Sequence, residues 1–254
     1  MRAFFAGILL ATLAVLSPTA SRARVLEVPN KYSTVQFAVD MALPGDTVRI
    51  HAGVYGESVL VFSTFGVNIV GEPGTIMAGS MVPSQAAISL FSPGNSVSGL
   101  TIRNYDVGVA ILASGHVDHC TVTGCNIGIY TSVFGDRANL PPRTQVDHNL
   151  VTGNGDGIYL DNCENVSVDH NTATLNGDGI GGAGIYIQFS DTCVIDHNVA
   201  DGNGEGIQSF FGVTDCSFMH NTAAHNETVD IEEDSPGFNT WKQNEFAPGR
   251  AIGI

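Results

Sequence analysis

The chain has 254 residues, and its 25 acidic and 10 basic residues give a net charge of −15 at neutral pH. This negative field excludes nucleic acid, anionic membranes and bare polyuronates as partners, unless divalent cations bridge an acidic polymer to the protein. The five cysteines are an odd number, so at least one has no partner within the chain. No Cys/His spacing typical of zinc sites occurs, and we expect no organic cofactor.

The N-terminal residues 1–23 have the three parts of a secretory signal. Arg2 supplies the basic start, residues 3–16 are apolar, and Ser21-Arg22-Ala23 is a small-x-small end. An apolar run of this length is shorter than the roughly 20 residues that span a bilayer, which argues against a stable membrane anchor. We therefore predict cleavage near Ala23 and a secreted or periplasmic protein. The mature chain, residues 24–254, would be a single domain with 8 basic and 25 acidic residues, a net charge of −17.

The next segment predicts one short helix. Residues 33–36 read Ser-Thr-Val-Gln, a capping-box pattern with Ser33 as the N-cap. Apolar residues then follow helical spacing until Pro44 and Gly45 end the run, at Val35, Ala38, Val39 and Ala42. We expect this helix to cover the open end of the domain that follows.

That domain is a repeat. One pattern recurs as VDHC at 117–120, VDHN at 146–149, VDHN at 168–171, IDHN at 195–198 and FMHN at 218–221. The histidines are 29, 22, 27 and 23 residues apart, so the unit is one coil of about 22 residues that sometimes carries a loop. Apolar residues alternate within each unit, and Gly and Asn punctuate its ends, which indicates short strands and tight turns. The sequence predicts an all-β parallel β-helix, with repeats clearest over 95–235 and a C-terminal cap or tail at 236–254.

Stacked coils bring like positions into columns. Two columns of asparagine are expected, Asn149, Asn171, Asn198 and Asn221 in one, and Asn154, Asn176, Asn203 and Asn226 in the other. Cys120 and Cys125 replace asparagine in one coil. Cys193 and Cys216 should be stacked neighbours, and a disulfide between them or a pair of free thiols are both open.

The segment VDHNLVTGNGDGIYL at 146–160 and its copies resemble the right-handed parallel β-helix repeat of the pectin-lyase-like superfamily, which includes pectate lyases and polysaccharide epimerases. The opening TVQFAVDMALPGDTVRIHAGVYGESV is similar to the start of pectin-esterase and lyase domains. The catalytic patterns of those families, such as GxxDFIFG and DPHD, are missing, which puts their chemistry in doubt. The chain is similar, too, to the periplasmic copper-associated β-helix family of nitrous oxide reductase maturation.

One outward column predicts a sugar-binding surface. Strand alternation turns Tyr130, Tyr159 and Tyr186 outward, in a column with Ala110, Gln208 and Asp230. The neighbouring outward column contains Asp161, Gln188 and Phe210. Aromatic faces bind the apolar side of a pyranose and polar neighbours bind its hydroxyls. The alternative is an aromatic stack that only stabilises the sheet.

A second column places acidic residues before the glycine of each unit, at Asp156, Asp178 and Glu205, together with Asp106 and Asn126. Carboxylates at coil spacing repel each other unless cations lie between them, so this column is a candidate Ca²⁺ site. The alternative is that Asp or Glu simply suits a turn before glycine.

The third column consists of His119, His148, His170, His197 and His220, each except the last preceded by aspartate. Imidazoles at coil spacing can share copper or zinc, or act as general bases. The loop at 131–145 contributes Arg137 and Arg143 near His119, which makes these arginines and His119, His148 and His170 the catalytic candidates. The alternative is duplication of a unit that happens to contain histidine.

Two functions follow from these patterns. The first is an exported β-helix protein that binds a polysaccharide and cleaves or epimerises it, as a lyase or epimerase. The second is a non-enzymatic protein on the same scaffold, either a periplasmic metal-handling accessory or a surface interaction protein.

Overall fold

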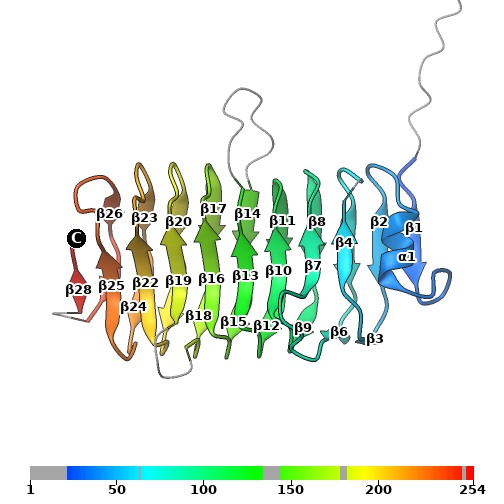
Figure 1. Ribbon diagram of the computed structural model, residues 1–254, viewed down its shortest axis with the longest axis horizontal. Helices are drawn as coiled ribbons and strands as arrows, with labels where there is room; N and C mark the ends of the chain where they lie inside the picture. Colours follow the sequence, from blue (N-terminus) through cyan, green and yellow to red (C-terminus); the bar gives the residue numbers. More distant parts are fainter. Residues whose placement is uncertain (1–21, 63, 134–143, 178–181, 248–249) are drawn as a thin grey trace, which may run out of the picture.

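The structure is a computed structural model that describes residues 22–62, 64–133, 144–177, 182–247 and 250–254. Arg137, Arg143, Asp178 and nearly all of the predicted signal segment lie outside these ranges. Figure 1 shows a single row of coils stacked along one long axis, with the N-terminal helix at one end. No helix among the described residues has the length and apolar character needed to cross a membrane.

The described strands form three parallel sheets that run the length of the stack. Sheet I contains β1 (Val25–Val28), β2 (Thr47–Ile50), β5 (Asn68–Gly71), β8 (Asn95–Ser98), β11 (Gly115–Asp118), β14 (Thr144–Asp147), β17 (Val166–Asp169), β20 (Val194–Asp196), β23 (Ser217–Met219) and β26 (Thr240–Lys242). Sheet II contains β3 (Gly53–Tyr55), β6 (Thr75–Ala78), β9 (Thr101–Arg103), β12 (Thr121–Thr123), β15 (Leu150–Thr152), β18 (Thr172–Thr174), β21 (Val199–Asp201), β24 (Thr222–Ala224) and β27 (Glu245–Phe246). Sheet III contains β4 (Val59–Val61), β7 (Ala86–Leu90), β10 (Val107–Ile111), β13 (Ile127–Thr131), β16 (Asp156–Asp161), β19 (Ala183–Gln188), β22 (Glu205–Phe210), β25 (Val229–Glu233) and β28 (Ala251–Ile252).

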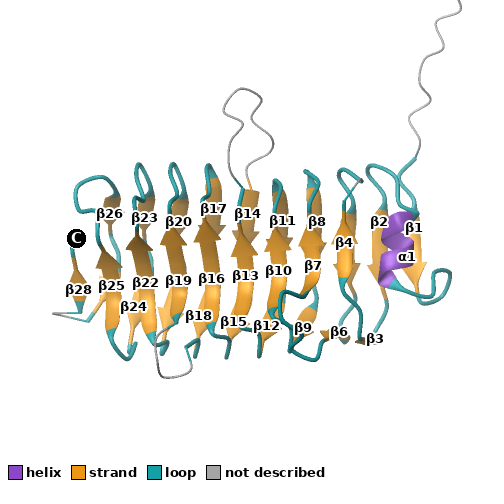
Figure 2. Ribbon diagram, viewed as in Figure 1, coloured by secondary structure: helices purple, strands orange, loops and turns teal. Residues whose placement is uncertain are grey.

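The repeat stacks in register, as the sequence pattern requires. Val117 pairs with Val146, which pairs with Val168, and these valines are fully buried. The isoleucines Ile129, Ile158 and Ile185 form the matching buried column of sheet III. Figure 2 shows that loops lie at the corners, between strands that make up most of each coil. The predicted right-handed parallel β-helix with a short N-terminal helix is confirmed.

The helix α1 (Val35–Asp40) begins one residue later than the capping-box pattern predicts. Thr34, not Ser33, is the N-cap, and its hydroxyl accepts a hydrogen bond from the Phe37 amide. Glu57, from a later coil, accepts hydrogen bonds from the amides of Val35 and Gln36 at 2.9 and 3.0 Å. A carboxylate supplied by tertiary structure therefore satisfies the first amides of the helix.

The asparagine columns form two continuous hydrogen-bonded ladders. Asn149 donates from its side chain to Asn171 Oδ1 at 3.0 Å, and Asn171 donates to Asn198 Oδ1 at 3.0 Å. Each side chain also bonds to the backbone; for example, Asn171 Nδ2 donates to the Val146 carbonyl at 2.7 Å. These buried amides hold the turns of successive coils together, so the expected structural role of the columns is confirmed.

All five cysteines are buried, and none of them forms a disulfide in the structure. Cys193 and Cys216 lie on adjacent coils as expected, and the Cys193 amide donates to Cys216 Sγ at 3.3 Å. Cys120 and Cys125 occupy asparagine positions, where their amides donate to Asn149 and Asn154 of the next coil.

Strands β26, β27 and β28 add a further coil to the described stack. Trp241 stacks on Phe218 with ring centroids 3.9 Å apart. Asp230 is fully buried and accepts a hydrogen bond from Asn226 Nδ2, so it ends the second asparagine ladder. The expectation that Asp230 faces outward in the tyrosine column is wrong, because Gln208 pairs with Glu232.

Candidate functional site: an imidazole–carboxylate ladder

The repeat histidines lie at the turn between sheets I and II, just after strands β11, β14, β17, β20 and β23. Each has a left-handed backbone, with φ between 51° and 55°. Histidine is one of the few non-glycine residues enriched in that region. From His148 onward, the backbone amide of each histidine donates a hydrogen bond to a backbone carbonyl of the next coil. His148, for example, donates to the Asp169 carbonyl at 3.2 Å, and Asp169 is the residue just before His170. The turn therefore fixes every imidazole on the outside of the coil.

The five imidazoles stack into one column. Ring centroids from His119 to His197 are 5.0 to 5.2 Å apart, and the ring planes differ by only 1° to 3°. The last pair differs, because the rings of His197 and His220 are 4.6 Å apart and tilted by 22°. Parallel rings point their nitrogen lone pairs in the same direction, so only the tilted pair converges.

Aspartates line the ladder and orient its rings. The Nδ1 atoms of His119 and His148 lie 2.6 and 2.9 Å from the carboxylates of Asp118 and Asp147. An ionised carboxylate only accepts hydrogen bonds, so Nδ1 carries the proton and Nε2 keeps its lone pair for a ligand. The imidazole side chains remain between 65% and 37% exposed from His119 to His220. We call this set of five histidines and four aspartates (118, 147, 169 and 196) the imidazole–carboxylate ladder.

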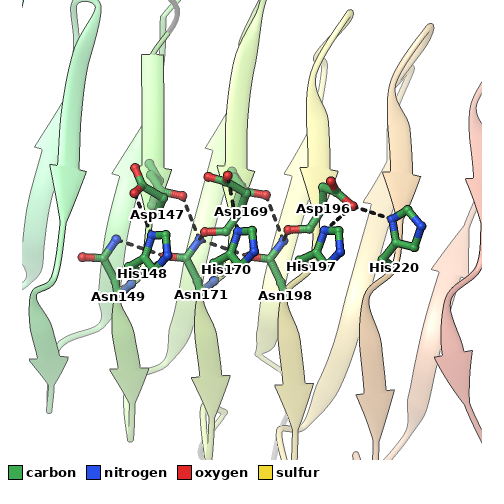
Figure 3. Close-up of polar contacts among 12 residues, drawn as sticks. Asp147, His148, Asn149, Asp169, His170, Asn171, Asp196, His197, Asn198 and His220 are labelled. Atoms are coloured by element: carbon green, nitrogen blue, oxygen red, sulfur yellow. Dashed lines mark hydrogen bonds and ion pairs between the residues drawn. The ribbon is translucent and has the colours of Figure 1, made fainter.

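The C-terminal end of the ladder departs from the repeat because Met219 replaces the aspartate before His220. His220 therefore uses the carboxylate of the previous coil, and Asp196 Oδ1 lies 3.0 Å from the Nδ1 atoms of both His197 and His220 (Figure 3). Ligand atoms of Asp196, His197 and His220 all lie within 4.8 Å of one another, the one such group of three found in the described part of the chain.

Electrostatics at this end follow from the shared carboxylate. The hydrogen bond to Asp196 raises the pKa of His220, although partial burial opposes the shift. Partial burial acts to raise the pKa of Asp196, but hydrogen bonds from His220 and His197 outweigh it and leave that pKa lowered. Asp196 is thus ionised and ready to accept a cation at neutral pH.

His116 and His225, which were not singled out from the sequence, also pair with aspartates at or near the turns. His116 faces outward from β11, and its Nε2 lies 2.5 Å from Asp147 Oδ1, so Asp147 lies between His116 and His148. His225 occupies the other asparagine turn, where its Nδ1 lies 2.8 Å from Asp201. The signal for His116 was available, because it is two residues before Asp118 on the same face of a strand.

The predicted tyrosine surface lies on sheet III. Tyr130, Tyr159 and Tyr186 pair in register and are half-buried. Their rings pack edge to face, with centroids 5.6 and 5.0 Å apart. Asp161 accepts hydrogen bonds from the Tyr130 hydroxyl at 3.1 Å and from Gln188 Nε2 at 2.9 Å. We call these three tyrosines with Asp161, Gln188 and Phe210 the tyrosine face.

The acidic residues Asp156 and Glu205 flank the tyrosine face on its other side. Ala183 lies between them in the register, so the two carboxylates are not on adjacent coils. Asp106 and Asn126 belong to a different column, because Asp156 pairs with Ile127. Burial raises the pKa of Asp156 and of Glu205, and Glu232 and Asp156 raise that of Glu205 further. The Ca²⁺ interpretation of this column stays a prediction.

These features define a right-handed parallel β-helix protein of the pectin-lyase-like kind, with polar ladders exposed at its corners. Residues 39–252 match the family described as periplasmic copper-binding protein (NosD), and the chain belongs to this family. Membership of this family supports a periplasmic location for the protein. No curated protein matches the chain.

Solved structures show the same fold at low identity. An alginate lyase from Paenibacillus sp. str. FPU-7 is similar at 13% identity and a TM-score of 0.59, over 91% of this chain and 98% of that one. The enzymatically active domain of tailspike protein 2 from bacteriophage CBA120 is similar at 14% identity and a TM-score of 0.59, over 90% of this chain and 43% of that one. Escherichia coli YbhC is similar at 12% identity and a TM-score of 0.59, over 99% of this chain and 90% of that one. Identities this low support a shared architecture and leave the chemistry to the site residues.

Proposed function

We propose that this protein is a periplasmic metal-binding β-helix that holds copper at the C-terminal end of the imidazole–carboxylate ladder. The observation that carries the proposal is the convergence of Asp196, His197 and His220, whose ligand atoms lie within 4.8 Å of one another. Two imidazoles and one carboxylate are a donor set that suits copper and also zinc. The Nδ1 atoms of His197 and His220 both lie 3.0 Å from Asp196 Oδ1, so a metal bound by all three groups would replace the protons that join them. The family description supports copper.

The other neighbouring histidine pairs of the ladder are less suited to binding one metal ion together. Metal–nitrogen bonds are about 2.0 Å long, so two imidazoles must point toward one atom. The rings from His119 to His197 are parallel and 5.0 to 5.2 Å apart, and they would have to rotate to meet at a metal. The tilted pair at His197 and His220 is closer to convergence before any ion binds. Three protein ligands on an exposed corner leave other coordination positions open.

Titration of the purified mature chain with Cu²⁺ tests this proposal. We expect His220→Ala and Asp196→Asn each to weaken copper binding by about tenfold or more, since each removes one of three ligands. Isothermal titration calorimetry would measure affinity, and electron paramagnetic resonance would count bound nitrogens.

His225→Ala is the matched control, because His225 also pairs with an aspartate at a turn but lies outside the ladder. The proposal would be wrong if copper failed to bind at micromolar concentration, or if His225→Ala weakened binding as much as His220→Ala. Circular dichroism on each variant separates loss of a ligand from loss of fold.

A second function is favoured by the geometry of the tyrosine face. We propose that Tyr130, Tyr159 and Tyr186 bind a polysaccharide that lies along the coil stack. Three half-buried rings beside hydrogen-bonding groups at Asp161 and Gln188 combine the apolar and polar contacts that sugars need. Lyase or epimerase activity on such a polymer stays a prediction, which absorbance of unsaturated uronates in pectate or alginate digests would test.

Replacement of all three tyrosines by alanine tests the face directly. We expect glycan affinity, measured by affinity electrophoresis, to fall by about tenfold or more while the chain still folds. The matched control replaces Phe62 and Phe91, a stacked aromatic pair 4.3 Å apart at the other end of the same sheet. Unchanged glycan binding in the triple variant would contradict the proposal.

A further inference from the structure

The charge around the tyrosine face limits what can dock there. Its three tyrosines lie between two rows of acidic and amide side chains on the outside of sheet III. One row contains Asp161 and Gln188, and the other contains Asp156 and Glu205. Glu232 continues the tyrosine column itself, after Gln208. A ligand that covers the rings therefore meets carboxylates on both sides.

None of these carboxylates forms an ion pair with a basic side chain in the described part of the chain. Asp161 accepts hydrogen bonds from Tyr130 and Gln188, which are neutral donors. Glu232 accepts one from Gln208 Nε2 at 3.1 Å. Partial burial acts on Asp156 and Glu205, and Glu232 and Asp156 repel the charge of Glu205, so a cation placed there would relieve an unfavourable field. An anionic polymer would increase it.

The tyrosine rings add a second preference for the same kind of ligand. Tyr159 and Tyr186 are turned by 71° relative to each other, so the column presents both ring faces and ring edges. A cation held over a ring face within about 6 Å is attracted by the quadrupole of the ring. The apolar side of a sugar ring also stacks on such a face.

We propose that the tyrosine face binds an amine-bearing glycan, a polymer of hexosamine units whose free ammonium groups pair with the carboxylates beside Tyr130, Tyr159 and Tyr186. This inference rests on the second proposed function and names its ligand class. Charge complementarity carries it, because Asp161 lies in the face and Asp156, Glu205 and Glu232 lie beside it. The described residues place no Lys or Arg in these columns. The sugar rings supply the stacking contacts, and the ammonium groups supply the charge.

The test compares three oligosaccharides of equal length by calorimetry: a chitosan oligomer with free amines, its fully N-acetylated counterpart and an oligogalacturonate. The pH is set below the amine pKa. We expect the chitosan oligomer to bind about tenfold or more tightly than the N-acetylated one, and binding to weaken as salt is raised. The oligogalacturonate should bind least.

Asp156→Asn with Glu205→Gln should lower the affinity for the chitosan oligomer to about that for the N-acetylated one, because the variant removes two of the carboxylates that pair with ammonium groups. Asparagine at 156 keeps the oxygen that accepts the Ala183 amide, so the variant preserves this contact. The charge-matched control is Asp215→Asn with Glu245→Gln, two exposed acidic residues outside sheet III. This control should keep the full preference.

The outcomes separate the two claims. Equal binding of the two chitin-type oligomers, or tighter binding of the oligogalacturonate, would overturn the amine-bearing ligand and leave glycan binding in place. Absence of binding by all three would overturn both. Competition by an oligolysine as effective as the chitosan oligomer would also overturn the proposal, because it would show unspecific attraction to an acidic protein.

Discussion

At the scale of single residues, Asp46 shows how one buried carboxylate organises the first coil. Its side chain is 2% exposed and accepts hydrogen bonds from the Arg24 amide at 2.7 Å and the Leu43 amide at 2.8 Å. The Arg24 guanidinium also bonds to it, at 2.9 Å from Nε. This hydrogen bonding, led by Arg24, outweighs burial and lowers the pKa of Asp46 to about 2.

Asp46→Asn should lower the free energy of unfolding at pH 7 by about 1–3 kcal/mol, because the variant loses charged hydrogen bonds to Arg24. A lowered pKa in the folded state means that the stabilisation is present above the ordinary carboxyl value of 3.8 and is lost as the pH falls through about 2. The difference in the free energy of unfolding between the wild-type protein and Asp46→Asn should therefore become smaller below pH 4. Urea unfolding at pH 7, 4 and 3 measures it, and a gap that stays constant with pH would contradict the assignment.

At the scale of the element, the asparagine ladders are the main interactions that hold the turns of successive coils together. Strands of sheets I and II are only two to four residues long, too short to hold a coil by themselves. Asn171 is buried, and its amide links three coils through Asn149, Asn198 and the Val146 carbonyl. Loss of one rung leaves buried polar groups of two neighbouring coils without partners.

Asn171→Ala should cost about 2 kcal/mol or more, because buried donors and acceptors such as the Asn149 amide lose their partner. Thermal and chemical unfolding measure the loss. Gln145→Ala, an exposed position on the outside of β14, is the control and should stay within about 0.5 kcal/mol of wild type. Equal effects at both positions would argue against the ladder as a source of stability.

At the scale of the whole molecule, each coil packs mainly on the coil before and the coil after it. Among the described strands, β19 pairs with β16 and β22, and Ile185 is fully buried within that stack. The stability of such a solenoid is close to a sum over coils and their interfaces. A defect in one coil should therefore stay local in its effects.

Ile185→Ala should lower the free energy of unfolding by about 2–5 kcal/mol through the cavity it leaves. Hydrogen–deuterium exchange should show faster exchange in β16, β19 and β22, with little change in β2 and β5 at the far end. Leu150→Ala, at a position 40% exposed on sheet II, is the control. An equal increase in exchange rate in all strands would contradict the expectation that the defect affects mainly the neighbouring coils.

The sequence predicted the architecture and the columns because a coil repeat translates directly into stacking. Once equivalent residues of the repeat, 22 to 29 positions apart, are known to lie one above another, the ladders of Asn, His and Tyr follow from alternation and spacing. Errors arose where the repeat shifts, as at Asp230, and where a partner comes from the neighbouring coil, as with Glu57 at the helix start. Neither event leaves a local sequence signal.

The sequence by itself determined the β-helix, the outward tyrosines and the histidine column, because these depend only on period and strand alternation. Only the tertiary structure decided which histidines can act together. The replacement of Asp by Met219 looks like a weak copy of the repeat, yet in three dimensions it turns His220 toward Asp196 and tilts its ring against His197. Such convergence depends on side-chain direction between coils, which periodicity does not encode.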